Sequence, residues 1–324
     1  MEATTSYEYE PNSLLCESKA VVFATLFTST LYSLVFLLSL MGNGLVLWVL
    51  VKFESLESLT NVFILNLCLS DLVFSCLLPV WISAHHWDWL LGDLGCKILN
   101  FIFSTSLYSS ILILTIMTIH RYLYVVRPLS SLRSHTLRFR VLVTAIVWAV
   151  SILSSVSEAF FHKDLSDQCD YSETRWFVIS VYQHNIFFLL SLGIILFCYV
   201  EILRTLLRSR SQRRHRTVRL IFAIVLAYFL SWAPYNLSLF LQTLAKQRLM
   251  QACQAHEQVE YAVQICRMLA FSHCCFNPVL YVFVGVKFRS HLKRLLGHFW
   301  LCRQQVLSHP TLPSGAFNEG ASFY

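Results

Sequence analysis

The chain has 324 residues, of which 56% are hydrophobic and only 13% are charged. Soluble domains average about 25% charged residues. The few Lys, Arg, Asp and Glu residues here fall almost entirely in short stretches between long apolar runs. This pattern excludes an ordinary soluble protein and indicates a membrane protein.

Seven apolar runs follow one another along the chain. They cover roughly residues 21–51, 60–83, 97–124, 139–161, 176–203, 217–244 and 260–284. Each reaches the ~20 residues that a helix needs to cross a ~30 Å hydrocarbon core, and none shows the period-two alternation of membrane β-strands. The sequence predicts an all-α membrane protein, a seven-transmembrane helix bundle over residues 21–285.

The distribution of basic residues predicts the orientation. With the N-terminus outside, most of the 25 Lys and Arg residues lie on the inner side, and the outer segments carry more acid than base. Basic residues favour the cytoplasmic side of a membrane. We therefore expect a multi-pass protein whose extracellular N-terminal segment is 1–20 and whose C-terminus is cytoplasmic.

Two cytoplasmic segments follow the last run. Residues 286–300 place apolar side chains at helical spacing between Lys and Arg, which predicts a short amphipathic helix on the inner membrane surface, in contact with lipids. Residues 301–324 contain Pro, Ser and Gly and are predicted to be a disordered cytoplasmic tail.

Asp71 is the only acidic residue that the runs place deep within a span. Because a charge in hydrocarbon costs at least ~2.5 kcal/mol, Asp71 predicts a polar cavity shared with Asn43, Ser110 and Asn277 on other runs. Two interpretations remain open. Asp71, Ser110 and Asn277 hold a sodium ion, or the polar groups form a hydrogen-bonded network that only fixes helix packing. Apart from this ion, no cofactor is expected.

Three prolines fall inside the runs, namely Pro79, Pro234 and Pro278. Each removes a backbone hydrogen bond and favours a kink. Trp232 lies two residues before Pro234, where a bulky ring can act as a two-position switch. The alternative is an aromatic side chain that is simply packed in the core.

Four cysteines fall in the outer segments: Cys16, Cys96, Cys169 and Cys253. An oxidising exterior favours disulfides. We expect Cys96 to pair with Cys169 and Cys16 with Cys253, although four cysteines allow three pairings. The chain contains no HExxH, GxSxG or P-loop motif, so neither an enzyme activity nor a nucleic-acid partner is expected.

Taken in order, these motifs resemble a rhodopsin-like G-protein-coupled receptor over all seven runs. The matching residues are Gly42-Asn43, Leu67 to Asp71, Cys96, Arg121-Tyr122, Trp148, Cys198-Tyr199, Trp232-Ala233-Pro234 and Asn277-Pro278 to Tyr281. Within that family the chain resembles the chemokine receptors, in the stretches SHCCFNPVLY and HRYLYVV and at Tyr32, Pro79 and Trp81. The Cys16–Cys253 pair resembles the second disulfide of that group. Departures from its usual pattern are His120, Ser191, Leu77 and Arg267.

The resemblance implies a plasma-membrane receptor with a role in the immune response. It would bind a small basic chemokine outside and activate an inhibitory-class G protein inside, with calcium signalling and chemotaxis downstream and with arrestin and receptor kinases as further partners. His120 keeps a second interpretation open, a scavenging or decoy chemokine receptor without G-protein signalling, because altered DRY motifs occur among such decoys. A transporter is disfavoured, because only one acid lies deep and no paired repeats are visible.

The resemblance also implies two ligand contacts. The acidic outer segments would steer a basic ligand, and Tyr7 and Tyr9 alternate with acids in SYEYE, which favours tyrosine sulfation over an unmodified acidic tail. The chemokine N-terminus would then enter the bundle. The residues expected to bind it are Tyr32, Trp81, Phe103, Asp170, Tyr235 and Arg267. Relatives often carry Glu where this chain has Arg267, which could instead pair with Glu260 or with a ligand carboxylate or carbonyl.

Activation and G-protein coupling are assigned by resemblance to a further set of residues. These are His120, Arg121, Tyr122, Tyr199, Trp232, Pro234, Asn277, Pro278 and Tyr281. A helix from Cys96 to Arg121 spans roughly 38 Å at ~1.5 Å per residue, so Arg121 lies at the inner rim if Cys96 lies at the outer one. Histidine is mostly neutral at cell pH, and Arg214 occupies the other common partner position. We predict an inactive state without an ionic lock on Arg121, held by apolar packing and hydroxyl contacts.

Overall fold

The structure of the chain is a computed structural model that describes residues 11–87, 89–126, 136–165, 168–207, 212–246 and 253–284. The predicted N-terminal contacts at Tyr7 and Tyr9, the amphipathic helix at 286–300 and the tail at 301–324 lie outside the described residues. The same holds for the side chains of Cys16, Cys253 and Tyr281.

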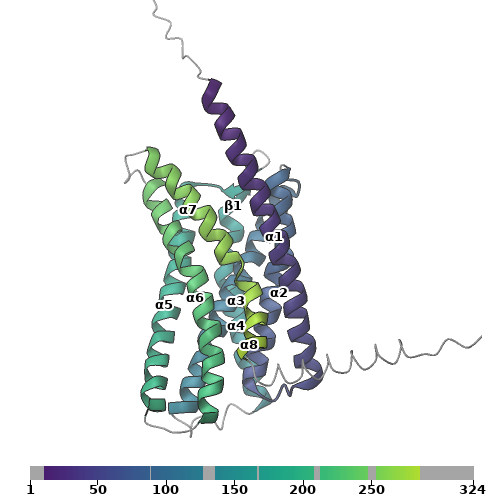
Figure 1. Cartoon of the computed structure of the whole chain (residues 1–324), viewed down its shortest axis with the longest axis vertical. Helices are drawn as coiled ribbons and strands as arrows, with labels where there is room; N and C mark the ends of the chain where they lie inside the picture. The colour runs from purple at the N-terminus through teal and green to yellow at the C-terminus, as the bar shows by residue number, and fades with distance from the viewer. Residues whose placement is uncertain are drawn as a thin grey trace, which may run out of the picture.

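Eight helices and one short β-hairpin make up the described chain. They are α1 (Pro11–Phe53), α2 (Leu59–His86), α3 (Gly92–Val126), α4 (Leu137–Phe161), β1 (His162–Asp164), β2 (Cys169–Tyr171), α5 (Thr174–Leu207), α6 (Gln212–Lys246), α7 (Cys253–Phe271) and α8 (His273–Val284). The helices stand side by side in an upright bundle (Figure 1). Each of the first six predicted runs falls within one helix, so the predicted seven-helix bundle is confirmed, with α7 and α8 forming the last passage.

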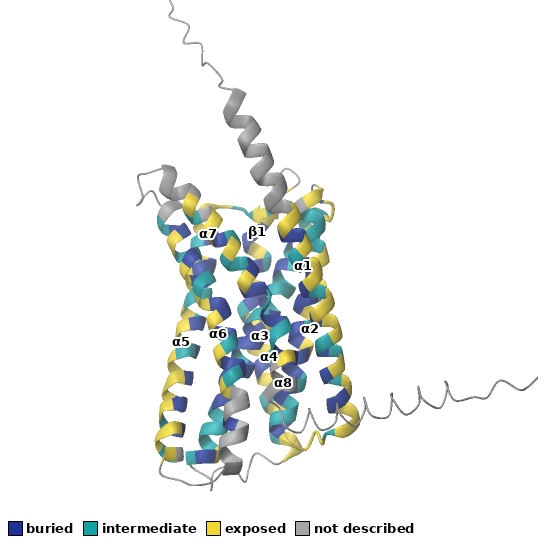
Figure 2. Ribbon diagram, in the orientation of Figure 1, coloured by how far each residue is buried: buried dark blue, intermediate teal, exposed yellow. Residues whose placement is uncertain are grey.

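The outside of the bundle is apolar. Among the described residues, six helices are long and apolar enough to cross a membrane. Large apolar side chains point outward, for example Leu153 and Leu190, which are 72% and 63% exposed. Figure 2 shows such exposed residues along the outer faces, with buried residues turned toward the centre. An exposed apolar surface of this kind is typical of a protein whose outer face contacts membrane lipids.

The last passage differs from the single helix predicted at 260–284, because it is interrupted at Ser272 between α7 and α8. Side chains compete for backbone carbonyls at this point: the Ser272 hydroxyl donates to the carbonyl of Leu269 at 2.6 Å, and His273 Nδ1 lies 2.7 Å from the carbonyl of Ala270. Local bonds of this kind compete with the regular helical ladder.

Pro278 explains how α8 is attached to α1. A proline has no N–H group, so the carbonyl of Cys274, four residues earlier, loses its helical donor. Asn43 Nδ2 donates to that carbonyl at 2.8 Å. The two helices approach so closely that a Cβ added at Gly42 would lie 2.8 Å from the Cβ of Pro278. Glycine at 42 therefore permits the contact that Asn43 then fixes.

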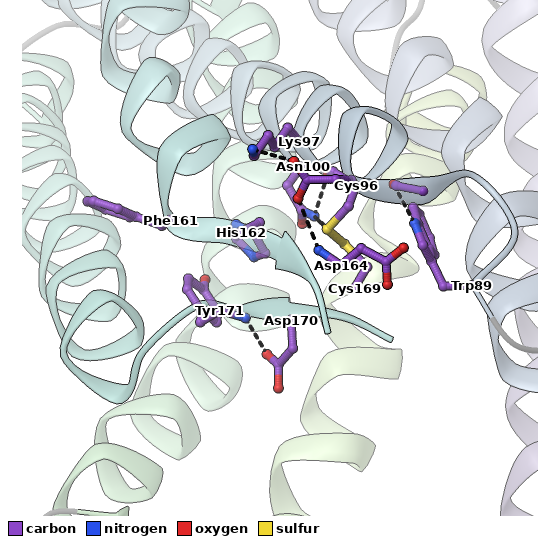
Figure 3. Close-up of a disulfide and its surroundings, with 12 residues drawn as sticks. Trp89, Cys96, Lys97, Asn100, Phe161, His162, Asp164, Cys169, Asp170 and Tyr171 are labelled. Atoms are coloured by element: carbon purple, nitrogen blue, oxygen red, sulfur yellow. Dashed lines mark hydrogen bonds and ion pairs between the residues drawn. A yellow bond between two sulfur atoms is a disulfide. The ribbon is translucent and has the colours of Figure 1, made fainter. Parts of the chain in front are cut away.

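The hairpin is the only departure from the all-α prediction within the described ranges. It lies between the fourth and fifth predicted apolar runs, and its strands pair antiparallel, with His162 opposite Tyr171 and Asp164 opposite Cys169. The Cys96–Cys169 disulfide joins β2 to the start of α3, which confirms this predicted pairing (Figure 3). We call this part of the bundle the disulfide end, and the opposite part the Arg121 end.

Candidate functional site

A cavity of about 380 Å³ lies at the disulfide end, between the hairpin and helices α3 to α7. Four of the six residues expected to bind the ligand inside the bundle line it: Phe103, Asp170, Tyr235 and Arg267. Trp232 on α6 also lines it. The cavity therefore connects the hairpin to the aromatic side chain that precedes the kink-forming Pro234.

Tyr32 and Trp81 are not among the residues that line this cavity, and their predicted contact with the ligand stays a prediction. Trp81 meets the lining residue Phe103 edge-on at 6.3 Å, and Tyr32 stacks on Phe271 with ring centroids 5.6 Å apart. Phe103 and Phe271 are themselves 5.5 Å apart. Tyr32 and Trp81 thus support the lining of the cavity from the side of α1 and α2.

Arg267 supplies a positive charge to the cavity wall from α7. The groups nearest to it electrostatically are the phenols of Tyr32, Tyr171 and Tyr235. Its Nε atom is buried without a hydrogen-bond partner, and none of the ion pairs within the described residues includes it. The predicted partner Glu260 has no described side chain. Arg267 therefore interacts with phenol groups, Tyr235 among them as a hydrogen-bond partner, and has no acidic partner among the described side chains.

Glu158, near the end of α4, is a second buried acid, which the sequence analysis did not single out. Its residue is 1% exposed, and it lines the cavity. Ser180 Oγ donates to Glu158 Oε1 at 2.5 Å. The sequence carried a signal for it: Ser151, Ser155 and Glu158 recur at helical spacing, and all three are buried, so they form one polar stripe on α4.

His162, at the start of β1, is the nearest titratable neighbour of Glu158. Its Nδ1 lies 2.9 Å from the backbone carbonyl of Glu158 and 3.6 Å from Oε2 of the same residue. The carbonyl can only accept, so Nδ1 carries the proton of the neutral ring. Burial lowers the pKa of His162 below its ordinary value, because a charged imidazolium loses its hydration there. His162 is therefore neutral at cell pH and does not compensate the carboxylate.

Asp71 lies deeper in the bundle, in its close-packed middle. Asn277 Nδ2 donates to Asp71 Oδ2 at 2.6 Å, and His273 Nε2 lies 3.7 Å from Oδ1. The hydroxyl of Ser110 is 2.9 Å from that of Ser70. The structure thus brings Asp71 and Asn277 into contact, as predicted, and pairs Ser110 with a neighbour on α2.

The chain was compared with known proteins. The family model described as 7 transmembrane receptor (rhodopsin family) matches residues 42–281. The chain is 71% identical to the human protein named Chemokine XC receptor 1, over 100% of this chain and 98% of that protein. It is 65% identical to the Mus musculus protein of the same name over the whole of both chains, and 36% identical to human C-C chemokine receptor type 4 over 97% and 92%.

The chain belongs to the chemokine receptors of the rhodopsin family. Members of this family are signalling receptors and not enzymes, which confirms that prediction. In this chemokine receptor the cavity therefore occupies the end that carries the Cys96–Cys169 disulfide, and the HRY motif lies at the opposite end of α3.

At the Arg121 end, the receptor holds its arginine through a hydroxyl. Arg121 Nη2 donates to Thr60 Oγ1 on α2 at 2.6 Å, and no ion pair of Arg121 occurs among the described residues. The neighbouring contacts are aromatic: Tyr122 lies 5.9 Å from Phe197 between ring centroids. The absence of an ionic lock on Arg121 in the inactive state stays a prediction.

The other described residues of the predicted activation set make mostly aromatic contacts. The ring of His120 lies 6.2 Å from that of Phe63, and Tyr199 meets the ring of Phe222 at 5.1 Å. Trp232 is 2% exposed and lies 5.1 Å from the ring of His273. Pro234 and Pro278 fall inside α6 and α8 as predicted.

Proposed function

We propose that this receptor binds an XC-type chemokine, lymphotactin or a close equivalent, on its extracellular side. Binding activates an inhibitory-class G protein on the cytoplasmic side, with calcium signalling and chemotaxis downstream. The observation that carries the proposal is the cavity at the disulfide end, lined by Arg267 where relatives often carry Glu, in a chain 71% identical to a protein named Chemokine XC receptor 1. The disulfide end is then extracellular, the C-terminus is cytoplasmic, and the receptor resides in the plasma membrane.

The contacts of Trp232 suggest how an occupied cavity signals. Trp232 lines the cavity, and its ring packs on Tyr235, Phe271 and His273 at centroid distances of 5.9, 6.4 and 5.1 Å. A ligand that displaces this ring acts on α6 next to Pro234, where the helix lacks a hydrogen bond. Movement of α6 opens the Arg121 end, and Arg121 leaves Thr60 to meet the G protein. Arrestin and receptor kinases act on the same open state.

The first contact of the chemokine falls on the N-terminal segment. We propose that its acidic residues attract the basic ligand and that sulfation of Tyr7 or Tyr9 strengthens this attraction. Replacing both tyrosines with Phe should weaken chemokine binding at low salt more than at high salt, because exposed charges are screened by added ions. Equal weakening at both salt concentrations would argue against an electrostatic role.

The test of signalling is a cyclic AMP assay in cells that express this chain. Lymphotactin should lower forskolin-stimulated cyclic AMP, and pertussis toxin should abolish the response. The alternative function, a scavenging receptor without G-protein signalling, rests on His120 in place of the usual Asp. Uptake of labelled chemokine without any change in cyclic AMP would favour that alternative.

We also propose that Asp71, Ser110 and Asn277 hold an allosteric sodium ion. Asp71 Oδ1 is buried and accepts no hydrogen bond from the described residues, so one hard anionic oxygen remains for a cation. Ser70 donates its proton to the carbonyl of Ser106, so Ser110 donates to Ser70 and keeps its own lone pairs. Sodium chloride should raise the thermal midpoint of the purified receptor relative to choline chloride, and Asp71→Asn should remove this difference.

A further inference from the structure

The cavity carries two opposite charges that the described chain does not pair with each other. Arg267 lines it from α7, and Glu158 lines it from α4. Tyr171 also lines the cavity and interacts electrostatically with both Glu158 and Arg267. A ligand that enters this cavity therefore meets a carboxylate on one side and a guanidinium on the other.

Glu158 has an incomplete set of partners for a buried carboxylate. Ser180 gives it the one hydrogen bond that a described side chain donates, and no Lys or Arg of the described residues pairs with it. The Ser180 hydroxyl is in turn 3.1 Å from the phenol of Tyr171. The other carboxylate oxygen of Glu158, Oε2, lies 3.6 Å from His162 Nδ1. The proton on Nδ1 is donated to the backbone carbonyl of Glu158, 2.9 Å away, and not to the carboxylate. A buried carboxylate without a cation is costly, so this side of the cavity favours a cationic ligand group.

The surroundings of Glu158 fit a compact ammonium group. The hydroxyls of Ser180 and Tyr171 offer oxygen acceptors beside it. Tyr108, whose ring stacks on His184, lines the cavity as an aromatic side chain and also interacts electrostatically with Glu158. An ammonium has three donors and no acceptor, and it is attracted to aromatic faces. Arg267 is itself a cation and would repel an ammonium group. Its N–H donors suit a carbonyl or carboxylate oxygen of the ligand.

From this arrangement we infer that Glu158 binds the free α-ammonium group of the chemokine's N-terminal residue, while Arg267 binds a backbone carbonyl or a carboxylate of the same N-terminal segment. The inference rests on the proposed chemokine-receptor function and assigns the polarity of its cavity. The ligand amine binds to Glu158 on α4. It does not bind on α7, where this chain has Arg267 in place of the Glu that relatives often carry. Asp170 on β2 is exposed and guides the ligand at the rim.

The decisive experiment is a double-mutant cycle between receptor and ligand. Wild-type receptor and Glu158→Gln are each tested with native lymphotactin and with lymphotactin acetylated only at its α-amino group. The readout is potency in the cyclic AMP assay at matched surface expression. Gln keeps the acceptor for Ser180 and loses only the charge. Glu173→Gln is the matched control, because Glu173 is an exposed acid that pairs with Arg175 on the same side of the receptor.

For wild-type receptor and for Glu173→Gln, acetylation should lower potency by about 10- to 100-fold, the range for one charge-assisted hydrogen bond. Glu158→Gln should lose a similar factor toward native ligand and little more on acetylation. An equal acetylation penalty in wild type and Glu158→Gln overturns the inference. If Glu158→Gln does not reach the surface, Glu158→Asp replaces it in the cycle, with a reduced but measurable penalty expected. A wild-type receptor that native lymphotactin neither binds nor activates overturns the proposed function as well.

Arg267 provides a second arm that separates the two sides of the cavity. Acetylation leaves every backbone carbonyl of the ligand in place. Arg267→Gln should therefore weaken native and acetylated ligand by the same factor, and its effect should add to that of acetylation. A loss of the acetylation penalty in Arg267→Gln, with the penalty intact in Glu158→Gln, would reverse the assigned polarity and overturn the inference.

Discussion

The receptor contains two buried carboxylates in contrasting regions. Asp71, in the close-packed middle, is 0% exposed and receives a hydrogen bond from Asn277 on α8. Glu158, at the disulfide end, is 1% exposed and lines a cavity of about 380 Å³. Burial is nearly the same for both, but of the two only Glu158 lines a cavity large enough to admit part of a peptide ligand. Exposure alone therefore does not separate a carboxylate that joins helices from one that receives a ligand; the free volume beside it does.

The largest expected effect is the loss of the Asp71 carboxylate from the middle of the bundle. Asp71→Ala leaves the amide of Asn277 buried without its acceptor, at a cost of about 1–3 kcal/mol. Asp71→Asn keeps an oxygen for that amide and should cost less. The measurement is the thermal midpoint of purified receptor in choline chloride, which removes any contribution from sodium. Equal losses in both variants would show that the bond to Asn277 is not what stabilises this region.

The same variants sharpen the contrast with Glu158. If Asp71 only couples helices, the potency ratio between native and acetylated chemokine should be the same in Asp71→Asn as in wild type. A change in that ratio would mean that the middle of the bundle and the cavity are not separable regions. The comparison uses ratios, so lower expression of the Asp71 variants does not affect it.

The next largest effect tests the approach of α1 to α8. Gly42→Ala would place a Cβ 2.8 Å from Pro278 Cβ, and overpacking of this kind costs about 1–3 kcal/mol. Gly44→Ala is the matched control, because its added Cβ meets nothing within 4 Å. A lower thermal midpoint is expected for Gly42→Ala only. A similar decrease in both variants would show that the contact with Pro278 is not the cause, because Gly→Ala inside a helix otherwise favours the folded state.

Much of the middle of the bundle was predictable from sequence, because its key residues are of types that are rarely found inside apolar membrane helices. Asp71 stands out as an acid in an apolar run, and Pro278 stands out as a proline in a helix. Each demands a partner that the same motifs supply, Asn277 for Asp71 and Asn43 for the carbonyl that Pro278 leaves without a donor. The Cys96–Cys169 pair was predictable for a similar reason, since few cysteines lie outside the runs.

The cavity was less predictable, because it is made by contacts between distant segments. Glu158 lies near the end of its run, where an acid can reach water, and only the packing of α4 against α5 and the hairpin shows that it is buried. Tyr32 and Trp81 were expected to contact the ligand by resemblance, and the structure packs them on the rings of Phe271 and Phe103. The interruption of the last helix at Ser272 depends on hydrogen bonds from side chains to backbone carbonyls. The hydrophobicity of the sequence does not predict such bonds.

A smaller effect is expected at the Arg121 end, where the arginine is held by Thr60 and not by an acid. His120→Asp adds a carboxylate next to Arg121 and should stabilise the inactive state by about 1 kcal/mol, the upper range for a partly exposed pair. That energy corresponds to about fivefold lower basal signalling. His120→Asn is the control for shape. Basal G-protein activity is measured at matched surface expression, and an unchanged or raised level in His120→Asp would contradict the prediction.

The smallest expected effect concerns pH and distinguishes the cavity from the middle of the bundle. Burial lowers the pKa of His162 in the folded receptor, whereas in the unfolded chain the ordinary value of ~6.5 applies. The folded state therefore binds fewer protons than the unfolded state below about pH 6.5, and stability decreases as the pH falls through that value toward the folded pKa.

The groups that interact electrostatically with His162 are Glu158, Asp170 and His184. Protonation of His162 would therefore place a cation beside Glu158. His162→Gln should reduce the fall in thermal midpoint between pH 7.4 and 5.5, and should also reduce the loss of chemokine potency over that range. If wild type and His162→Gln lose potency equally on acidification, the charge beside Glu158 does not control ligand binding.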